Sequence, residues 1–158
     1  MSAAPLLMTR LATAADLEAL VSLSCRLSCE AEGIPAVSAS FITAATASIR
    51  AALESPECKI WLVESVAGRP EPVATLRAEL RTSPGAPAPI GFLCDVFVLP
   101  PWRRKGLGRR LIENAREFFT RHGVQEIRLE TQLGHEAAER YWAAAGFHPF
   151  RTVWRRAL

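Results

Sequence analysis

The residues best suited to chemistry form one basic segment, which follows an apolar stretch and opens an amphipathic one. In "LPPWRRKGLGRRLIENA" two glycines are surrounded by five cationic side chains: Arg103, Arg104, Lys105, Arg109 and Arg110. A helix start already leaves its first backbone N–H groups without partners and carries about half a positive charge. Further cations there should repel one another. A bound anion would neutralise that charge, so the pattern predicts an anion site.

Two glycines indicate which groups would hold the anion. Gly106 and Gly108 have no Cβ, so a ligand can approach the main chain closely. A diphosphate fits, because it carries several oxygens and can span a helical turn. Neither common phosphate loop matches: G-x-x-x-x-G-K-[ST] is absent, and Leu111 stands where G-x-G-x-x-G needs its third glycine. The alternative is a solvated, charged helix start whose glycines only serve the turn.

The composition predicts a single globular domain over residues 1–158. Apolar residues make up 49% of the chain and charged residues 22%, and no apolar run approaches the roughly 20 residues of a membrane helix. A formal net charge of +3 is too small to indicate a nucleic-acid partner, and few aromatic residues interleave with the basic segment. The N-terminus lacks the pattern of a signal peptide, so we expect a cytoplasmic protein without a membrane partner.

The cysteines fit that compartment as reduced, mostly buried thiols. Cys25 and Cys29 lie one helical turn apart, and Cys58 and Cys94 stand alone. No histidine pair or second cysteine pair lies near the first two to complete a metal site. The sequence therefore predicts no metal.

The elements that position the basic segment follow from hydrophobic periodicity. Helical spacing predicts four helices, over residues 14–32, 41–55, 107–122 and 135–145. Alternation and apolar runs predict strands over residues 6–10, 59–65, 72–82, 92–98 and 125–131, with one or two more within 147–158. Thr13 and Asp16 suit a capping box before the first helix. This order predicts one α/β domain.

A longer pattern around the basic segment resembles a known family. "VLPPWRRKGLG" is similar to the V-x-P-x-x-R-x-x-G-x-G signature of the GNAT superfamily of acetyl-coenzyme A-dependent N-acetyltransferases. Downstream, "HEAAERYWAAAGF" resembles the superfamily's N-x-x-A-x-x-x-Y-x-x-x-G-F helix. The resemblance covers nearly the whole chain. It implies a GNAT-like fold, in which a mixed central β-sheet is splayed between two parallel strands and flanked by about four helices.

The resemblance implies acetyl-coenzyme A (acetyl-CoA) as co-substrate. Its pyrophosphate would lie on the backbone N–H groups of one turn, formed by Arg103, Arg104, Lys105, Gly106, Leu107, Gly108 and Arg109. Its pantetheine arm would pair with the preceding strand at Val96, Phe97 and Val98. A bulge near this point commonly opens the cleft in the superfamily. His135 stands where an asparagine commonly contacts the pantetheine, and Trp142 lies on the same helical stripe.

The implied chemistry is direct attack of a neutral amine on a thioester. A base must take a proton from the amine, and Asp95 is the one acid of the strand over 92–98. A structural ion pair with an arginine is the alternative for Asp95. An acid would protonate the thiolate, but Trp142 occupies the usual tyrosine position and Tyr141 precedes it. Three alternatives follow. Tyr141 reaches the sulfur and protonates it, or water or His135 protonates it instead. In the third, Tyr141 and Trp142 only pack against their neighbours.

The sequence leaves the acceptor open. Glu30, Glu32 and, more weakly, Glu79 are candidate contacts for a cationic amine, against the alternative of solvated surface charge. We expect a small primary amine, such as an amino acid, a polyamine or an amine-bearing antibiotic. The alternatives are a protein N-terminus or lysine as acceptor, and a non-catalytic module that only binds acyl-CoA. Superfamily members are often dimers, so a homodimer is a further possibility.

Overall fold

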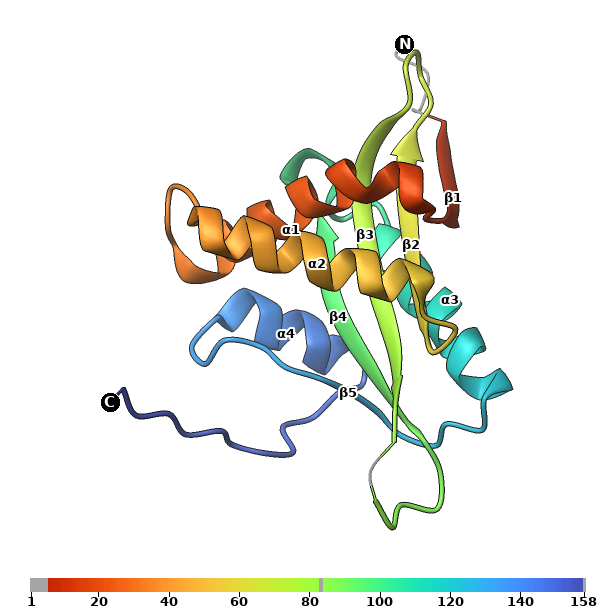
Figure 1. Ribbon diagram of the computed structural model, residues 1–158, viewed down its shortest axis with the longest axis vertical. Coiled ribbons are helices and arrows are strands. Elements are labelled where there is room, and N and C mark those ends of the chain that lie inside the picture. The colour runs from red at the N-terminus through yellow and green to blue at the C-terminus, as the bar shows by residue number, and fades with distance from the viewer. Residues whose placement is uncertain (1–5, 83, 158) are drawn as a thin grey trace.

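The computed structural model describes residues 6–82 and 84–157. The five strands are β1 (Leu7–Leu11), β2 (Cys58–Ser65), β3 (Glu71–Arg81), β4 (Ile90–Val98) and β5 (Ile127–Leu129). The helices are α1 (Leu17–Glu32), α2 (Ala39–Glu54), α3 (Leu107–Arg121) and α4 (Glu136–Ala144), with short 3₁₀ turns η1 (Ala14–Asp16) and η2 (Pro100–Trp102). These elements follow the predicted order as far as α4 (Figure 1).

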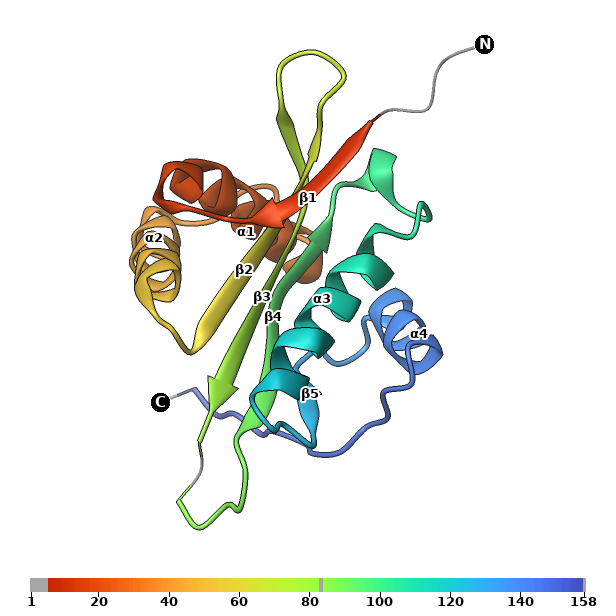
Figure 2. The same cartoon turned by 90° about the vertical axis from the view of Figure 1, so that its right-hand side faces the viewer.

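One mixed sheet carries the fold, with the strands in the order β1-β2-β3-β4-β5. The first four strands pair antiparallel, and β4 pairs with β5 in parallel. That parallel pairing is limited to Gly91–Leu93 opposite Ile127–Leu129, so the two strands separate beyond it. Helices α1 and α2 cover one face of the sheet, and α3 and α4 lie on the other (Figure 2). The GNAT-like fold predicted from the sequence is confirmed.

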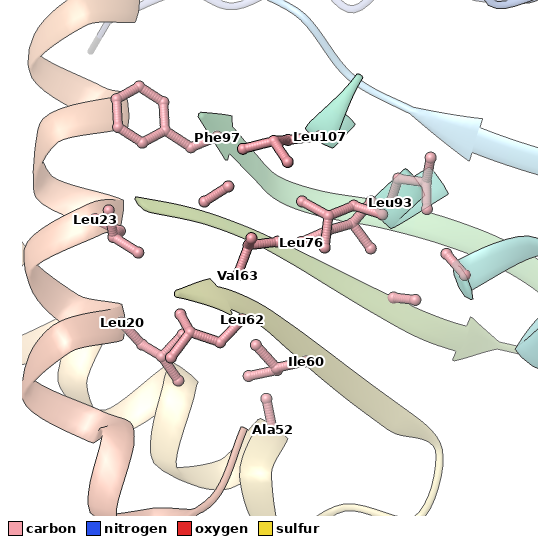
Figure 3. Packing of buried hydrophobic residues seen from close by; sticks show 14 of the residues in the cluster. Leu20, Leu23, Ala52, Ile60, Leu62, Val63, Leu76, Leu93, Phe97 and Leu107 are labelled. Carbon is pink, nitrogen blue, oxygen red and sulfur yellow. The ribbon is translucent and has the colours of Figure 1, made fainter. Parts of the chain in front are cut away.

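The core fills both spaces between sheet and helices. On one face, Leu20 of α1 lies beside Leu62 of β2, and Phe97 of β4 lies against the same helix (Figure 3). On the other face, α3 buries Leu111, Ala115, Phe118 and Phe119. Phe119 packs directly on β4, where a methyl group at Gly91 would lie 2.8 Å from its ring. This close contact fixes α3, and hence the turn before it, against β4.

The capping box predicted before the first helix is present, and two further local signals bound the helices. The Asp16 carboxylate accepts a hydrogen bond from the Thr13 N–H at 2.7 Å, which completes the capping box before α1. The Ser38 hydroxyl accepts one from the Phe41 N–H at 3.1 Å and caps α2. Gly33 ends α1 in the left-handed conformation. Residues 1–5 belong to the N-terminal segment that lacks the pattern of a signal peptide, and they lie outside the described residues.

The final strand predicted within 147–158 is wrong for the residues described. Residues 147–157 form no strand, and the chain after α4 runs past β5 and away from the body (Figure 1). Pro149 has no N–H to give to a ladder, and β5 offers three residues instead of the predicted seven. Val153 and Trp154 are consequently exposed. Alternation alone does not form a strand where no partner edge is long enough; Leu158 lies outside the described residues.

None of the helices that the structure describes has the length and the apolar character needed to cross a membrane.

Candidate active site

The turn between β4 and α3 presents a row of free backbone donors. Arg104 (φ 61°) and Gly106 (φ 78°) are both left-handed there, which turns successive N–H groups toward one side. The first helical bond of α3 runs from the Arg110 N–H to the Gly106 oxygen at 3.0 Å. Across the described residues, none of the N–H groups from Arg104 to Arg109 makes a hydrogen bond. The geometry of an anion site is present.

The side chains of this turn do different things. Arg104 and Arg109 are exposed, and the Lys105 ammonium lies 4.7 Å from the centre of the Trp102 ring. Leu107 is buried in the core, so its backbone N–H alone faces the turn. Arg103 points back toward the fold and makes two hydrogen bonds, described below. The backbone, with cations around it, is therefore the part suited to hold a diphosphate.

Beside the turn, β4 has an open edge. The Leu99 N–H donates to the Val73 oxygen at 2.9 Å, toward β3. Successive residues direct their backbone groups to opposite edges, so Phe97 also bonds toward β3 while Val96 and Val98 point away from it. Pairing with β5 has ended at Leu93. This edge can accept an added strand-like ligand, with one competitor: Arg103 Nε already donates to the Val98 oxygen at 2.9 Å.

A β-bulge lies in the middle of β4. The register with β3 shifts between Thr75 and Arg77, and Asp95 adopts a left-handed conformation (φ 48°). The expected bulge is thus present. Regular alternation along 92–98 predicts Cys94 on the face opposite Asp95. This prediction is wrong, because the extra residue interrupts the period. Both side chains approach the cluster formed by Arg77 and its neighbours on β3.

Asp95 lies in a compact charged cluster on the face covered by α2. Arg77 Nε lies 3.2 Å from carboxylate oxygens of both Asp95 and Glu79, without a well-aligned hydrogen bond to either. Arg77 also donates to the Ser48 hydroxyl of α2 at 3.0 Å. Burial raises the pKa of Asp95. The positive charge of Arg77 lowers this pKa, and the negative charge of Glu79 raises it further. A carboxylate with a raised pKa can exchange a proton more readily than an ordinary one.

The thiols of this cluster are weak acids. Burial raises the pKa of Cys94 to about 11 and that of Cys58 to about 12. Both stay protonated near neutrality, so neither offers a thiolate nucleophile. The Glu79 carboxylate forms ion pairs with Arg77 at 3.2 Å and with Arg81 at 2.9 Å. In the described parts of the chain, no group of three potential ligands converges on a metal position.

The aromatic pair of α4 divides between two environments. The Tyr141 hydroxyl lies against Gly108, so close that any Cβ at Gly108 would collide with it. Trp142 packs against the core, with its ring edge-on to Phe147 at 5.3 Å. Burial raises the pKa of Tyr141, so its hydroxyl keeps its proton. His135 caps α4, its Nδ1 accepting from the Ala138 N–H at 3.1 Å.

A groove of about 670 Å³ lies between α1, the α1–α2 loop and the end of β4. Phe97, Leu99 and Pro100 of the β4 end form one wall. Glu30 lines the groove, but its carboxylate pairs with Arg103 at 2.6 Å. Glu32 is exposed and is not part of the lining. The structure thus brings Asp95 and Glu79 together through Arg77. Glu30 is joined instead to Arg103 of the turn before α3, and Glu32 lies outside the groove.

Arg77 is the residue of this site that the sequence reading missed. It lies on the buried face of β3 and contacts Asp95, Glu79 and α2. The available signal was a single arginine flanked by Leu76 and Ala78 within an apolar strand. A charge in such a place needs a partner.

Comparisons with known proteins agree with this geometry. The sequence model of the acetyltransferase (GNAT) family matches residues 27–147. The chain therefore belongs to the GNAT acetyltransferase family. The resemblance drawn from the sequence is confirmed, and the enzyme class that it defines is the acetyl-CoA-dependent N-acetyltransferases.

Several solved structures share the fold across nearly the whole chain. An aminoglycoside N-acetyltransferase, AAC(6')-Iy, crystallised with CoA, has a TM-score of 0.78 at 20% identity and covers 99% of this chain and 98% of its own. A GCN5-related N-acetyltransferase from Ralstonia eutropha JMP134 has a TM-score of 0.76 at 19% identity, with 96% and 98% covered. A predicted acetyltransferase from Clostridium acetobutylicum, crystallised with acetyl-CoA, has a TM-score of 0.75 at 18% identity, with 96% of each chain covered.

One curated relative is similar in sequence over a shorter stretch. N-alpha-acetyltransferase 30 of Schizosaccharomyces pombe is 26% identical over 68 residues, which are 43% of this chain and 45% of that protein. The match spans less than half the length of that relative.

Proposed function

We propose that the protein transfers the acetyl group of acetyl-CoA to the primary amine of a small molecule. The observation that carries this proposal is the row of free N–H groups from Arg104 to Arg109, next to the open edge of β4. A phosphate-linked carrier with a strand-like arm matches both features at once. The curated relative, by its name, keeps a protein N-terminus as a second acceptor class.

The coenzyme fits the residues present. The N–H groups from Arg104 to Arg109 would hold its pyrophosphate, with Arg104, Lys105 and Arg109 adding charge around it. Val96 and Val98 would bond to its pantetheine arm, which requires Arg103 to yield or share the Val98 oxygen. His135, the N-cap of α4, and Trp142 within α4 are the candidate side-chain contacts to the coenzyme. When bound, acetyl-CoA supplies a thioester carbonyl that an amine can attack.

Asp95 is the proposed base. It lies on β4 at the bulge, one residue before the backbone that would bind the pantetheine. Burial raises its pKa, which makes its carboxylate a stronger proton acceptor than an exposed one. Arg77 positions its carboxylate from 3.2 Å. The amine proton would pass to Asp95, directly or through water.

Tyr141 is the proposed acid. Its hydroxyl reaches the start of α3 at Gly108, although helical geometry on α4 places it about 100° from the stripe of His135 and Trp142. Burial raises its pKa, so it carries a proton to give to the leaving thiolate. Glu30, Glu32 and Glu79 remain candidate acceptor contacts of lesser standing, because Glu30 and Glu79 are already paired. A cytoplasmic location and a homodimer stay predictions.

Two measurements test the proposal together. Titration calorimetry at modest salt should detect binding of both CoA and acetyl-CoA, and a thiol-release assay should detect turnover with some member of an amine panel. If the coenzyme binds but no amine of the panel causes release of the CoA thiol, the non-catalytic module would be favoured. The absence of coenzyme binding would overturn the transferase and the module alike.

A further inference from the structure

The groove beside the end of β4 has a wall that is apolar apart from three residues. Those three are Ser22, Arg26 and Glu30. The remainder includes Ile34 and Val37 of the α1–α2 loop, Ile42 of α2 and the β4 end. Ile42 is 43% exposed, so with its apolar neighbours it adds to an exposed apolar patch. Such a surface gains most by burying an apolar ligand.

The charges of the groove do not suit a polycation. Glu30 is the one acid of the lining, and Arg103 Nη2 donates to its carboxylate at 2.6 Å. Arg26 lines the same groove and is exposed. The lining acid is thus neutralised by one arginine, and a second arginine adds positive charge. A ligand with several ammonium groups would find no unpaired carboxylate and would be repelled.

The groove lies next to the proposed reaction centre. Phe97 lines it and stands two residues after Asp95, on the same face of the sheet. Leu99 and Pro100 continue its wall toward the turn before α3. The Glu30–Arg103–Val98 chain of hydrogen bonds joins the groove to the open edge of β4. An amine whose body fills the groove can therefore present its nitrogen near Asp95.

From these observations we infer that the acceptor is a primary amine on an apolar body, not a polyamine or an aminoglycoside. The inference rests on the proposed acetyl transfer and names the substrate class of that same site. It separates this chain from the aminoglycoside acetyltransferase that shares its fold. The apolar body can belong to a free amine or to the first residue of a peptide.

The experiment compares kcat/KM across matched amines with acetyl-CoA held saturating. Butylamine, hexylamine and 2-phenylethylamine form the apolar arm, spermidine and kanamycin the polycationic arm, and a hexapeptide beginning with leucine the peptide arm. We expect a gain of about fourfold per added methylene along the alkyl series. The polycations should be at least tenfold poorer than hexylamine. The peptide arm distinguishes the two sources of the apolar body.

A pair of variants checks that the groove sets this preference. Ile42→Asp places an unpaired carboxylate on the groove wall and should shift the ratio of spermidine to hexylamine by at least tenfold toward spermidine. Ala44→Asp adds the same charge to an exposed position of α2 outside the groove and should leave the ratio unchanged. Calorimetric binding of CoA should be the same in both variants, which shows that each is folded.

The outcomes separate this inference from the function on which it rests. Turnover that is faster with spermidine or kanamycin than with every apolar amine would overturn the inference and leave the transferase standing. An equal shift in Ile42→Asp and Ala44→Asp would also overturn it, because the groove would then not select the acceptor. If none of these amines is acetylated while CoA still binds, the proposed transferase itself would be contradicted.

Discussion

Asp95 combines two features that fold stability alone does not favour. It holds a left-handed backbone conformation inside a strand, which costs on the order of 1 kcal/mol for a residue with a Cβ. Its side chain is 25% exposed and faces an arginine without a well-aligned hydrogen bond. Strained backbone and a carboxylate with a raised pKa cluster at functional sites. These features support the role of Asp95 as the base.

Asp95→Asn tests that role. It keeps the size of the side chain and removes the proton acceptor, so kcat should fall by about 10²- to 10⁴-fold. A base works unprotonated, so wild-type kcat should fall as pH drops through the pKa of Asp95, which burial raises above 3.8. A pH–rate profile should lose this acid limb in the variant. If Asp95 only pairs with Arg77, the Asp95→Asn variant would keep the wild-type kcat and the acid limb of the profile. Only its free energy of unfolding would change.

At the scale of elements, the meeting of α4 with the start of α3 matters most. Gly108 has no Cβ, and the Tyr141 hydroxyl lies in the space that a Cβ would occupy. A glycine expected only to admit a phosphate therefore also admits the side chain proposed as the acid. The two proposed roles use one position, so the proposed phosphate site and the proposed acid depend on the same packing.

This dependence predicts a non-additive pair of substitutions. Tyr141→Phe should lower kcat at least tenfold and leave CoA affinity within about twofold, because it removes only the hydroxyl. Gly108→Ala should weaken CoA binding at least tenfold, since its methyl group displaces Tyr141 across the turn. Combining them should restore much of the affinity, as the clash is with the hydroxyl. Calorimetry on all three variants checks this; strictly additive losses would mean that the methyl group blocks the phosphate itself.

The elements were more predictable than their contacts. The turn between β4 and α3 could be predicted from the preceding strand, the two glycines and the helical periodicity, because each is a local property of the sequence. Helical geometry also gave the angle between Tyr141 and Trp142, but not which of them faces α3, because that depends on how α4 docks. The face of the sheet on which Cys94 lies could not be predicted from alternation either. One inserted residue at the bulge shifts every later side chain to the other face.

At the scale of the whole molecule, the site depends on pairs distant in sequence. Arg103 and Glu30 lie 73 residues apart and link the turn before α3 to α1. Arg10 and Glu64 lie 54 apart and join β1 to β2. Periodicity cannot choose such partners among 19 basic and 16 acidic residues. The architecture could therefore be predicted, whereas the ion pairs that orient α1 and β4 around the groove could not.

The pairing of Arg10 with Asp16 should make stability fall at acidic pH. Arg10 donates to both Asp16 oxygens at 2.8 Å, and this contact, with the Thr13 N–H, lowers the pKa of Asp16 to about 2 from 3.8. Because the native pKa is the lower one, the stabilisation is full above the ordinary value and is lost as pH falls through 2. Asp16→Asn should therefore lower the free energy of unfolding by about 1 to 3 kcal/mol at pH 7.

Urea unfolding of the wild type and Asp16→Asn at several pH values measures this directly. The gap between them should be constant from pH 7 to about 5 and should close between about pH 4 and 2, where the native Asp16 takes up its proton. Glu18→Gln, which removes an exposed carboxylate from the first turn of α1, should change stability by only a few tenths of a kcal/mol. A gap that persists unchanged at pH 2 would show that the charge of Asp16 does not hold β1 to α1.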